Sequence, residues 1–108
     1  MDLIMYKKEF PDYDYEIKLP EGFWDSSWHN DVCPSIRIDI HNDLGVKIYC
    51  DYAEWGRREL GNQNQFTVCL EDDHSLDTLT DKGRFDDFDD AVLFANALAA
   101  KFKKEKND

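Results

Sequence analysis

The chain has 108 residues, 42% of them hydrophobic and 14% aromatic. This length is enough for one modest hydrophobic core, so we expect a single domain over residues 1–108. Its 24 acidic and 13 basic residues give a formal net charge of −11. Such a charge argues against direct binding to nucleic acid or to an anionic membrane surface, because both attract cationic proteins. A basic protein is the partner that this charge favours.

The first ten residues carry an acid at position 2 and an apolar run of only three residues, which is not the pattern of a signal peptide. No segment approaches the roughly 20 apolar residues of a membrane-spanning helix. The three cysteines, Cys33, Cys50 and Cys69, are an odd and widely spaced set. We therefore expect a cytoplasmic protein with reduced cysteines.

Four segments place apolar side chains at alternate positions, which is the pattern of a half-buried β-strand. These segments are residues 13–19, 36–40, 46–52 and 66–70. No helical pattern interrupts them, so they predict an antiparallel meander. Residues 20–35 and 71–85 are expected to be long loops.

The second and third predicted strands are expected to form a hairpin around a loop of residues 41–45. The predicted cross-strand pairs are Ile40 with Val46, Asp39 with Lys47, Ile38 with Ile48 and Arg37 with Tyr49. In this register the isoleucines face the core and an opposite-charge pair lies on the outer face.

A helix is predicted near the C-terminus, where apolar residues recur at intervals of three and four. The stripe consists of Phe88, Ala91, Val92, Ala95, Leu98, Ala99 and Phe102. Together these elements predict a two-layer α+β fold in which a four-stranded antiparallel sheet carries one C-terminal helix on one face.

Four aspartates stand just before and within the start of this helix, in the sequence "DDFDD" of residues 86–90. Asp86 or Asp87 as the N-cap, with further acids in the first turn, would satisfy the unpaired amides and the helix dipole. A divalent metal site is the alternative, but the chain offers no second helix and no phosphate-binding loop. His29 and Cys33 lack the further partners of a zinc site. We expect no metal, no cofactor and no enzymatic activity.

The segment from Glu71 to Asp90 holds nine acids against Lys82 and Arg84, and we expect it to form one acidic region. Three tryptophans in predicted loops are either buried anchors or contacts for a partner. The predicted partner-binding residues are Glu71, Asp72, Asp73, Asp77, Asp81, Asp86, Asp87, Trp24, Trp28 and Trp55.

In size, charge and expected architecture the chain resembles two groups of natural inhibitors. One comprises small phage and mobile-element proteins that block host defence, including anti-CRISPR proteins and DNA mimics, and the other comprises immunity proteins of nuclease toxins. The resemblance implies a non-enzymatic inhibitor that binds a basic surface of a nucleic-acid-handling protein. Two alternatives remain open: a structural or assembly subunit that self-associates, and a small metal-dependent enzyme that uses the aspartates of the helix start.

Overall fold

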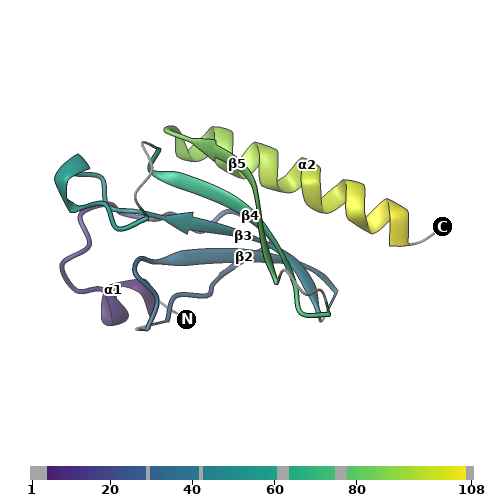
Figure 1. The fold of residues 1–108 in the computed structure, drawn as a ribbon, viewed down its shortest axis with the longest axis horizontal. Helices are drawn as coiled ribbons and strands as arrows, with labels where there is room; N and C mark the ends of the chain where they lie inside the picture. Colours follow the sequence, from purple (N-terminus) through teal and green to yellow (C-terminus); the bar gives the residue numbers. More distant parts are fainter. Residues whose placement is uncertain (1–4, 29, 42, 61–63, 75–77, 107–108) are drawn as a thin grey trace.

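The structure, a computed structural model, describes residues 5–28, 30–41, 43–60, 64–74 and 78–106. Five strands in these ranges form one antiparallel sheet, and a long helix lies across one face of it (Figure 1). The strands are β1 (Phe23–Asp25), β2 (Ser35–His41), β3 (Leu44–Cys50), β4 (Phe66–Asp72) and β5 (Leu79–Phe85). The helices are α1 (Met5–Glu9), the 3-10 helix η1 (Trp55–Arg57) and α2 (Phe88–Lys106).

The α+β class, the antiparallel meander and the packing of the C-terminal helix on the sheet are confirmed. Each strand pairs with its neighbour in the chain, in the order β1-β2-β3-β4-β5. The predicted strand number was wrong, because the sheet has five strands rather than four. Two of the five, β1 and β5, lie in segments that the sequence predicted to be loops. None of the described helices combines the length and apolar character needed to cross a bilayer.

The two missed strands lack the alternating pattern because each lies at an edge of the sheet. β1 has only three residues, and Gly22, at φ 89°, turns the chain into it. β5 reads "LTDKGRF" and has charged residues and a glycine in its middle. Charges, short length and a bulge are the devices by which edge strands resist pairing with other chains. A bulge does interrupt the β4–β5 pairing, between Val68 and Cys69 on β4.

The predicted strand at residues 13–19 is absent, although its side chains largely face the core as expected. Tyr13 and Tyr15 pack against the core cluster and Ile17 is buried within it, but Leu19 is 44% exposed. The segment has extended or irregular backbone without a strand partner. Alternation therefore identified a chain that crosses the core, but the pattern contains no information about whether a sheet edge is available for pairing.

The hairpin register is shifted by two residues from the prediction. Ile38 pairs with Val46 and Arg37 with Lys47, whereas the prediction paired Ile38 with Ile48. A shift of two preserves the face of every side chain, because strand side chains alternate with a period of two. The isoleucines therefore still face the core. The shift has two sources: a tighter turn, which pairs His41 with Leu44, moves the register by one residue, and a bulge between Asp39 and His41 moves it by one more.

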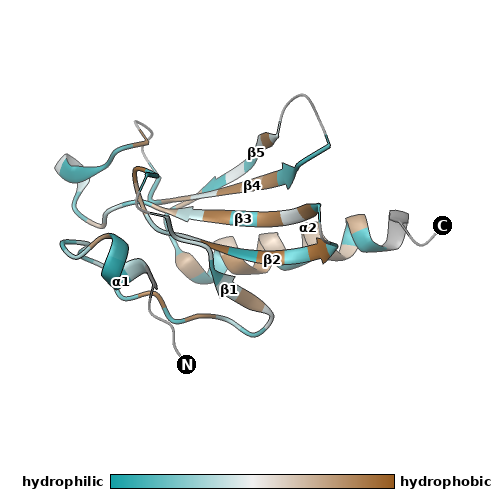
Figure 2. Cartoon of the chain, turned by 90° about the horizontal axis from the view of Figure 1, so that it is seen from below, coloured by the Kyte–Doolittle hydropathy of each residue, from teal (hydrophilic) through white to brown (hydrophobic). Residues whose placement is uncertain are grey.

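The core lies between the sheet and α2. Three alanines of the helix are buried against it, Ala91, Ala95 and Ala99, and their small side chains bring the helix close to the strands. The apolar residues of β2, β3 and β4 pack beneath them; the core cluster includes Ile36, Val46, Ile48, Cys50, Phe66 and Val68. In Figure 2, which is seen from below, these strands lie in front of α2 and carry most of the hydrophobic colour of the sheet.

The opposite face of the sheet holds a compact network of charged side chains centred on Arg37, which is only 7% exposed. Its guanidinium donates to Asp39 at 2.7 Å and to Glu71, and Glu71 also pairs with Lys47 at 3.5 Å. The two cations that face each other across β2 and β3 thus share a carboxylate from β4. The guanidinium lies directly over Gly45, where a Cβ atom would come within 2.3 Å of Arg37 Nε.

Candidate protein-binding site

The acidic segment 71–90 does not form one continuous region, contrary to expectation, because β5 runs through its middle. One end of β5 pairs Leu79 with Glu71, and the other pairs Phe85 with Phe66. At about 3.3 Å per residue, the strand separates these ends by roughly 20 Å. The acids before β5 therefore lie at one end of the sheet, and those after it lie at the other (Figure 1).

The first group, which we call the hairpin-tip acids, comprises Asp43, Asp72 and Asp73. These residues join the β2–β3 turn to the β4–β5 turn. The amide of Asp73 donates to the carbonyl of Asp43, and His74 Nε2 lies 2.8 Å from Asp43 Oδ2. The side-chain hydrogen bond to Asp43 raises the pKa of His74, with smaller contributions from the charges of Asp43, Asp72 and Asp73. Asp77, another predicted contact, lies outside the described residues.

Two further predicted acids lie on the sheet face opposite α2 and are already paired with cations. Glu71 is held by Arg37 and Lys47, as described above. Asp81 accepts a hydrogen bond from Arg84 Nε at 2.8 Å. These pairs make both carboxylates part of the local structure of the sheet surface.

The second group, the helix-start acids, comprises Asp86, Asp87, Asp89 and Asp90. Asp87 is the N-cap, because its Oδ2 accepts the amide of Asp90 at 3.1 Å. This confirms one of the two predicted caps. Asp86 instead accepts a hydrogen bond from Asn64 Nδ2 at 3.1 Å. All four side chains are exposed, so the helix start presents a concentrated negative charge.

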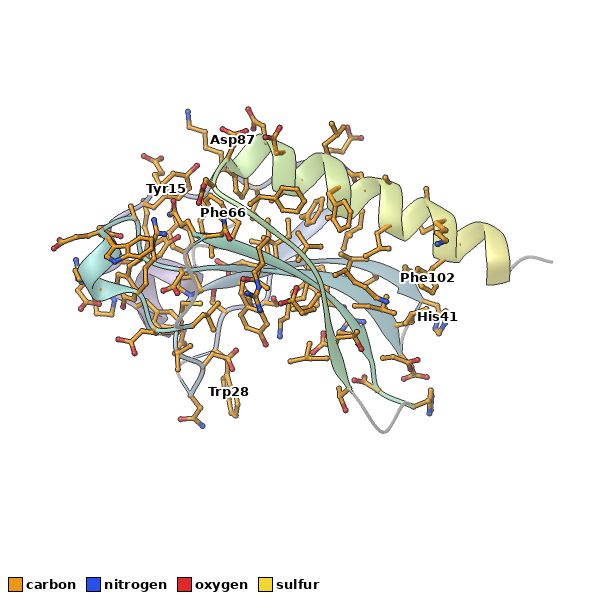
Figure 3. The ribbon with its side chains drawn as sticks, turned by 45° about the horizontal axis from the view of Figure 1, so that its top comes forward. Tyr15, Trp28, His41, Phe66, Asp87 and Phe102 are labelled. Atoms are coloured by element: carbon orange, nitrogen blue, oxygen red, sulfur yellow. The ribbon has the colours of Figure 1, made fainter. Side chains whose placement is uncertain are left out.

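Acids from residues 12–16 lie beside the helix start, and Tyr15 connects the two. The Tyr15 ring packs against Phe66 and Phe88, with centroid distances of 5.6 and 6.2 Å. Figure 3 shows Tyr15, Phe66 and Asp87 together at this end of the molecule. Burial raises the pKa of Tyr15, and the nearby charges of Asp89 and Asp87 raise it further. Tyr15 is therefore the residue through which this segment contacts the helix start.

Two cavities adjoin at Tyr15 and Glu16, which line both. The α1 cavity has a volume of about 400 Å³ and is lined by Tyr6, Lys7, Phe10, Pro11, Tyr13, Asp14, Tyr15 and Glu16. The helix-start cavity has a volume of about 390 Å³ and is lined by Tyr15, Glu16, Lys18, Pro20, Phe88, Asp89 and Val92. Both combine aromatic or aliphatic walls with carboxylates, and such a combination suits a ligand with an apolar stem and a positive charge.

The 51–60 segment holds residues 12–14 in place through Asp14 and Arg57. Asp14 accepts the amides of Ala53 and Glu54 at 2.7 and 2.9 Å, and Arg57 NH1 lies 3.7 Å away. Burial by itself would raise the pKa of Asp14, but these amides and the guanidinium outweigh it and lower the pKa. The segment depends in turn on Asp51, which is fully buried and accepts the amides of Tyr52, Glu59 and Leu60.

The three tryptophans are exposed by 46% (Trp24), 54% (Trp28) and 62% (Trp55), so none is a buried anchor. They do not form one surface. Trp55 begins η1, next to the amides that Asp14 accepts, and Arg58 lies over its ring at 5.2 Å. Trp24 donates to Asp39 on the sheet face opposite α2. Trp28 lies on that same side of the molecule, away from Asp87 (Figure 3).

In the part of the chain that the structure describes, no group of three or more His, Cys, Asp or Glu side chains is arranged to hold a metal ion. All three cysteines are buried and unpaired. Burial is also the main reason why the pKa of Cys69 is raised to about 11, and it raises the pKa of Cys33 and Cys50 too. The thiols are therefore protonated at neutral pH.

A comparison with known protein families, curated proteins and solved structures found no match of any of the three kinds. The site must therefore be interpreted from its own chemistry. Asp86 and Asp87, which the sequence predicted as contacts, do not line the helix-start cavity, and Tyr15, Glu16 and Asp89, which do, were not among the predicted contacts. The sequence "YDYEI" of residues 13–17, in which aromatic and acidic residues alternate, was the signal that could have indicated them.

Proposed function

We propose that this chain is a non-enzymatic inhibitor that binds a basic surface of a protein that handles nucleic acid. The target is a nuclease toxin or a component of host defence, and a cytoplasmic location is part of the proposal. Carboxylates of the inhibitor would pair with the arginines and lysines that otherwise hold phosphates.

The observation that best supports the proposal is the concentration of exposed carboxylates at the helix start and in residues 12–16, next to the helix-start cavity and the α1 cavity. Pure surface charge would serve only solubility and long-range attraction. Carboxylates beside aromatic and aliphatic walls can also bury partner surface, and buried aromatic contacts supply much of the affinity of a protein interface. The helix-start end combines both features.

Affinity capture from host lysate with the tagged full-length chain, followed by elution in salt steps, tests the proposal. We expect a basic nucleic-acid-handling protein that elutes at moderate salt, because charge-steered association weakens as salt rises. The captured protein is then purified and its activity measured with and without the chain. Loss of that activity at stoichiometric amounts supports the proposal. A captured partner without a basic surface, or a basic one whose activity is unchanged, contradicts it.

Self-association is a second candidate, and the position of β5 favours it. β5 is the last strand of the sheet, and it pairs with β4 on one side. Its other edge has no strand partner among the described residues, so a second copy could pair there only against the charges and the bulge that oppose such pairing. Sedimentation velocity over a hundredfold range of concentration tests this alternative. A monomer throughout the range eliminates it.

A further inference from the structure

The helix-start cavity differs from the α1 cavity in how its cationic side chain is placed. Lys7, whose ammonium group lies 5.9 Å from the centroid of the Tyr6 ring, lines the α1 cavity. In the α1 cavity, the ammonium group of Lys7 therefore already lies over an aromatic side chain of the lining. In the helix-start cavity the side chains of Tyr15, Phe88 and Val92 form apolar walls, and Glu16 and Asp89 contribute carboxylates.

The two carboxylates of this cavity are exposed and available to a ligand. Among the described residues, neither Glu16 nor Asp89 forms an ion pair with a lysine or arginine. Lys18 supplies the one cationic side chain in the lining. The other acids of the helix start, Asp86, Asp87 and Asp90, are exposed and do not line the cavity.

The same end of the molecule shows how such chemistry holds an arginine. The guanidinium of Arg57 lies over the Tyr52 ring at 4.7 Å from its centroid. The same group pairs with Asp12 at 3.1 Å and with Asp14 at 3.7 Å. An aromatic ring and two carboxylates together match the flat face and the forked donors of a guanidinium.

We propose that the helix-start cavity binds one arginine side chain of the basic partner, between the Tyr15 and Phe88 rings and the carboxylates of Glu16 and Asp89. This inference rests on the proposed function and names the group that the site recognises. The methylene stem of the arginine packs against Val92, Pro20 and the rings. Arginine is favoured over lysine because a planar guanidinium can stack on a ring and donate to two carboxylates together.

The test uses three blocked seven-residue peptides of glycine and serine with a single central arginine, lysine or citrulline. Binding to the full-length chain is followed by the shifts of the Phe88 ring and Val92 methyl resonances. We expect the arginine peptide to shift these resonances and to bind several-fold more tightly than the lysine peptide. Citrulline has nearly the same shape without the charge, and we expect it to cause no saturable shift. Equal binding of the arginine and citrulline peptides would overturn the proposal.

Two variants with the same loss of charge on the same helix turn provide the decisive control. Asp89→Asn removes a carboxylate of the cavity, whereas Asp90→Asn removes a neighbouring exposed one that does not line it. We expect Asp89→Asn to weaken arginine-peptide binding about threefold to tenfold, as for loss of a charge-assisted hydrogen bond, and Asp90→Asn to change it less than twofold. Lys18→Gln, which removes the competing cation, should strengthen binding. Equal effects of Asp89→Asn and Asp90→Asn would show attraction by charge alone and overturn the proposal.

Failure of this inference and failure of the proposed function give different results. If a captured basic protein is inhibited but Asp89→Asn and Asp90→Asn weaken its binding equally, the inhibitor function stands and the arginine cavity is wrong. If the arginine peptide binds as expected but a captured protein has no basic surface, the cavity stands and the proposed target class is wrong.

Discussion

The two acidic ends of the molecule have similar charge but different surroundings. The hairpin-tip acids bind backbone amides and His74 of the turns that they join, and neither cavity described above includes them in its lining. At the other end, the helix-start acid Asp89 lines a cavity whose walls include the rings of Tyr15 and Phe88. The comparison teaches that a count of carboxylates locates negative charge, whereas a binding site requires apolar concave surface next to that charge.

The largest effect is expected from Asp51→Ala, which disrupts the 51–60 segment that holds residues 12–14 in place. Loss of this buried carboxylate leaves the amides of Tyr52, Glu59 and Leu60 without their acceptor. We expect the free energy of unfolding to fall by about 3 kcal/mol, measured by urea denaturation.

The same variant tests whether the two ends are independent. Arg57 should lose its position, so resonances of residues 12–16 should shift while those of His74 stay unchanged. Shifts of equal size at both ends would contradict the separation of the molecule into two acidic ends.

Gly45→Ala perturbs the sheet face next to the hairpin tips. A Cβ atom at this position would lie 2.3 Å from Arg37 Nε and would displace the guanidinium from Asp39 and Glu71. We expect a loss of about 2 kcal/mol of stability in thermal or urea unfolding. Gly56→Ala is the matched control, because an added Cβ there meets nothing within 4 Å. Equal stability of the two variants would show that the Arg37 network tolerates a Cβ atom at position 45.

Asp87→Ala tests the division of roles within the helix start. Loss of the N-cap should lower the stability of the protein by about 1 kcal/mol. Asp86→Ala removes the same charge but no cap, and we expect a smaller loss in the same urea titration. A larger loss for Asp86→Ala would show that the cap was assigned to the wrong aspartate.

The smallest effect concerns the hairpin tips and depends on pH. The pKa of His74 is raised by Asp43, so the protonated form is favoured in the folded state. Its stabilising contribution is therefore complete below the pKa of the unfolded chain and is lost as pH rises through the pKa of the folded state. An NMR titration should give a lower His74 midpoint in Asp43→Asn than in the unaltered protein. An unchanged midpoint would show that the 2.8 Å contact does not persist in solution.

The sequence predicted what depends on regular patterns of apolar residues. The stripe from Phe88 to Phe102 correctly located α2, and alternation correctly located β2, β3 and β4. The pattern failed at residues 13–19, where a chain that crosses the core alternates without pairing, and at β5, whose edge position allows a polar sequence. Because β5 was missed, Asp72 and Asp87 were expected to share one surface.

For the candidate site, the sequence indicated the acids of the helix start but not the residues 12–20 that lie beside them. Asp86 and Asp87 are evident as a run of acids, but their relation to Tyr15 and Glu16 depends on how residues 12–20 cross the end of the sheet. That path is determined by long-range contacts, such as the hydrogen bonds of Asp14 to Ala53 and Glu54. No local pattern contains such contacts.

The most direct test of the account compares two double variants of equal net charge for binding to a blocked hexa-arginine peptide by calorimetry at physiological salt. Glu16→Gln with Asp89→Asn alters the helix-start cavity, and Asp43→Asn with Asp73→Asn alters the hairpin tips. We predict that the first pair weakens binding by about tenfold or more, from the loss of two charge-assisted contacts, and that the second changes it less than twofold. Equal weakening by both pairs would contradict the account, because it would show that the peptide responds to total charge and not to the site.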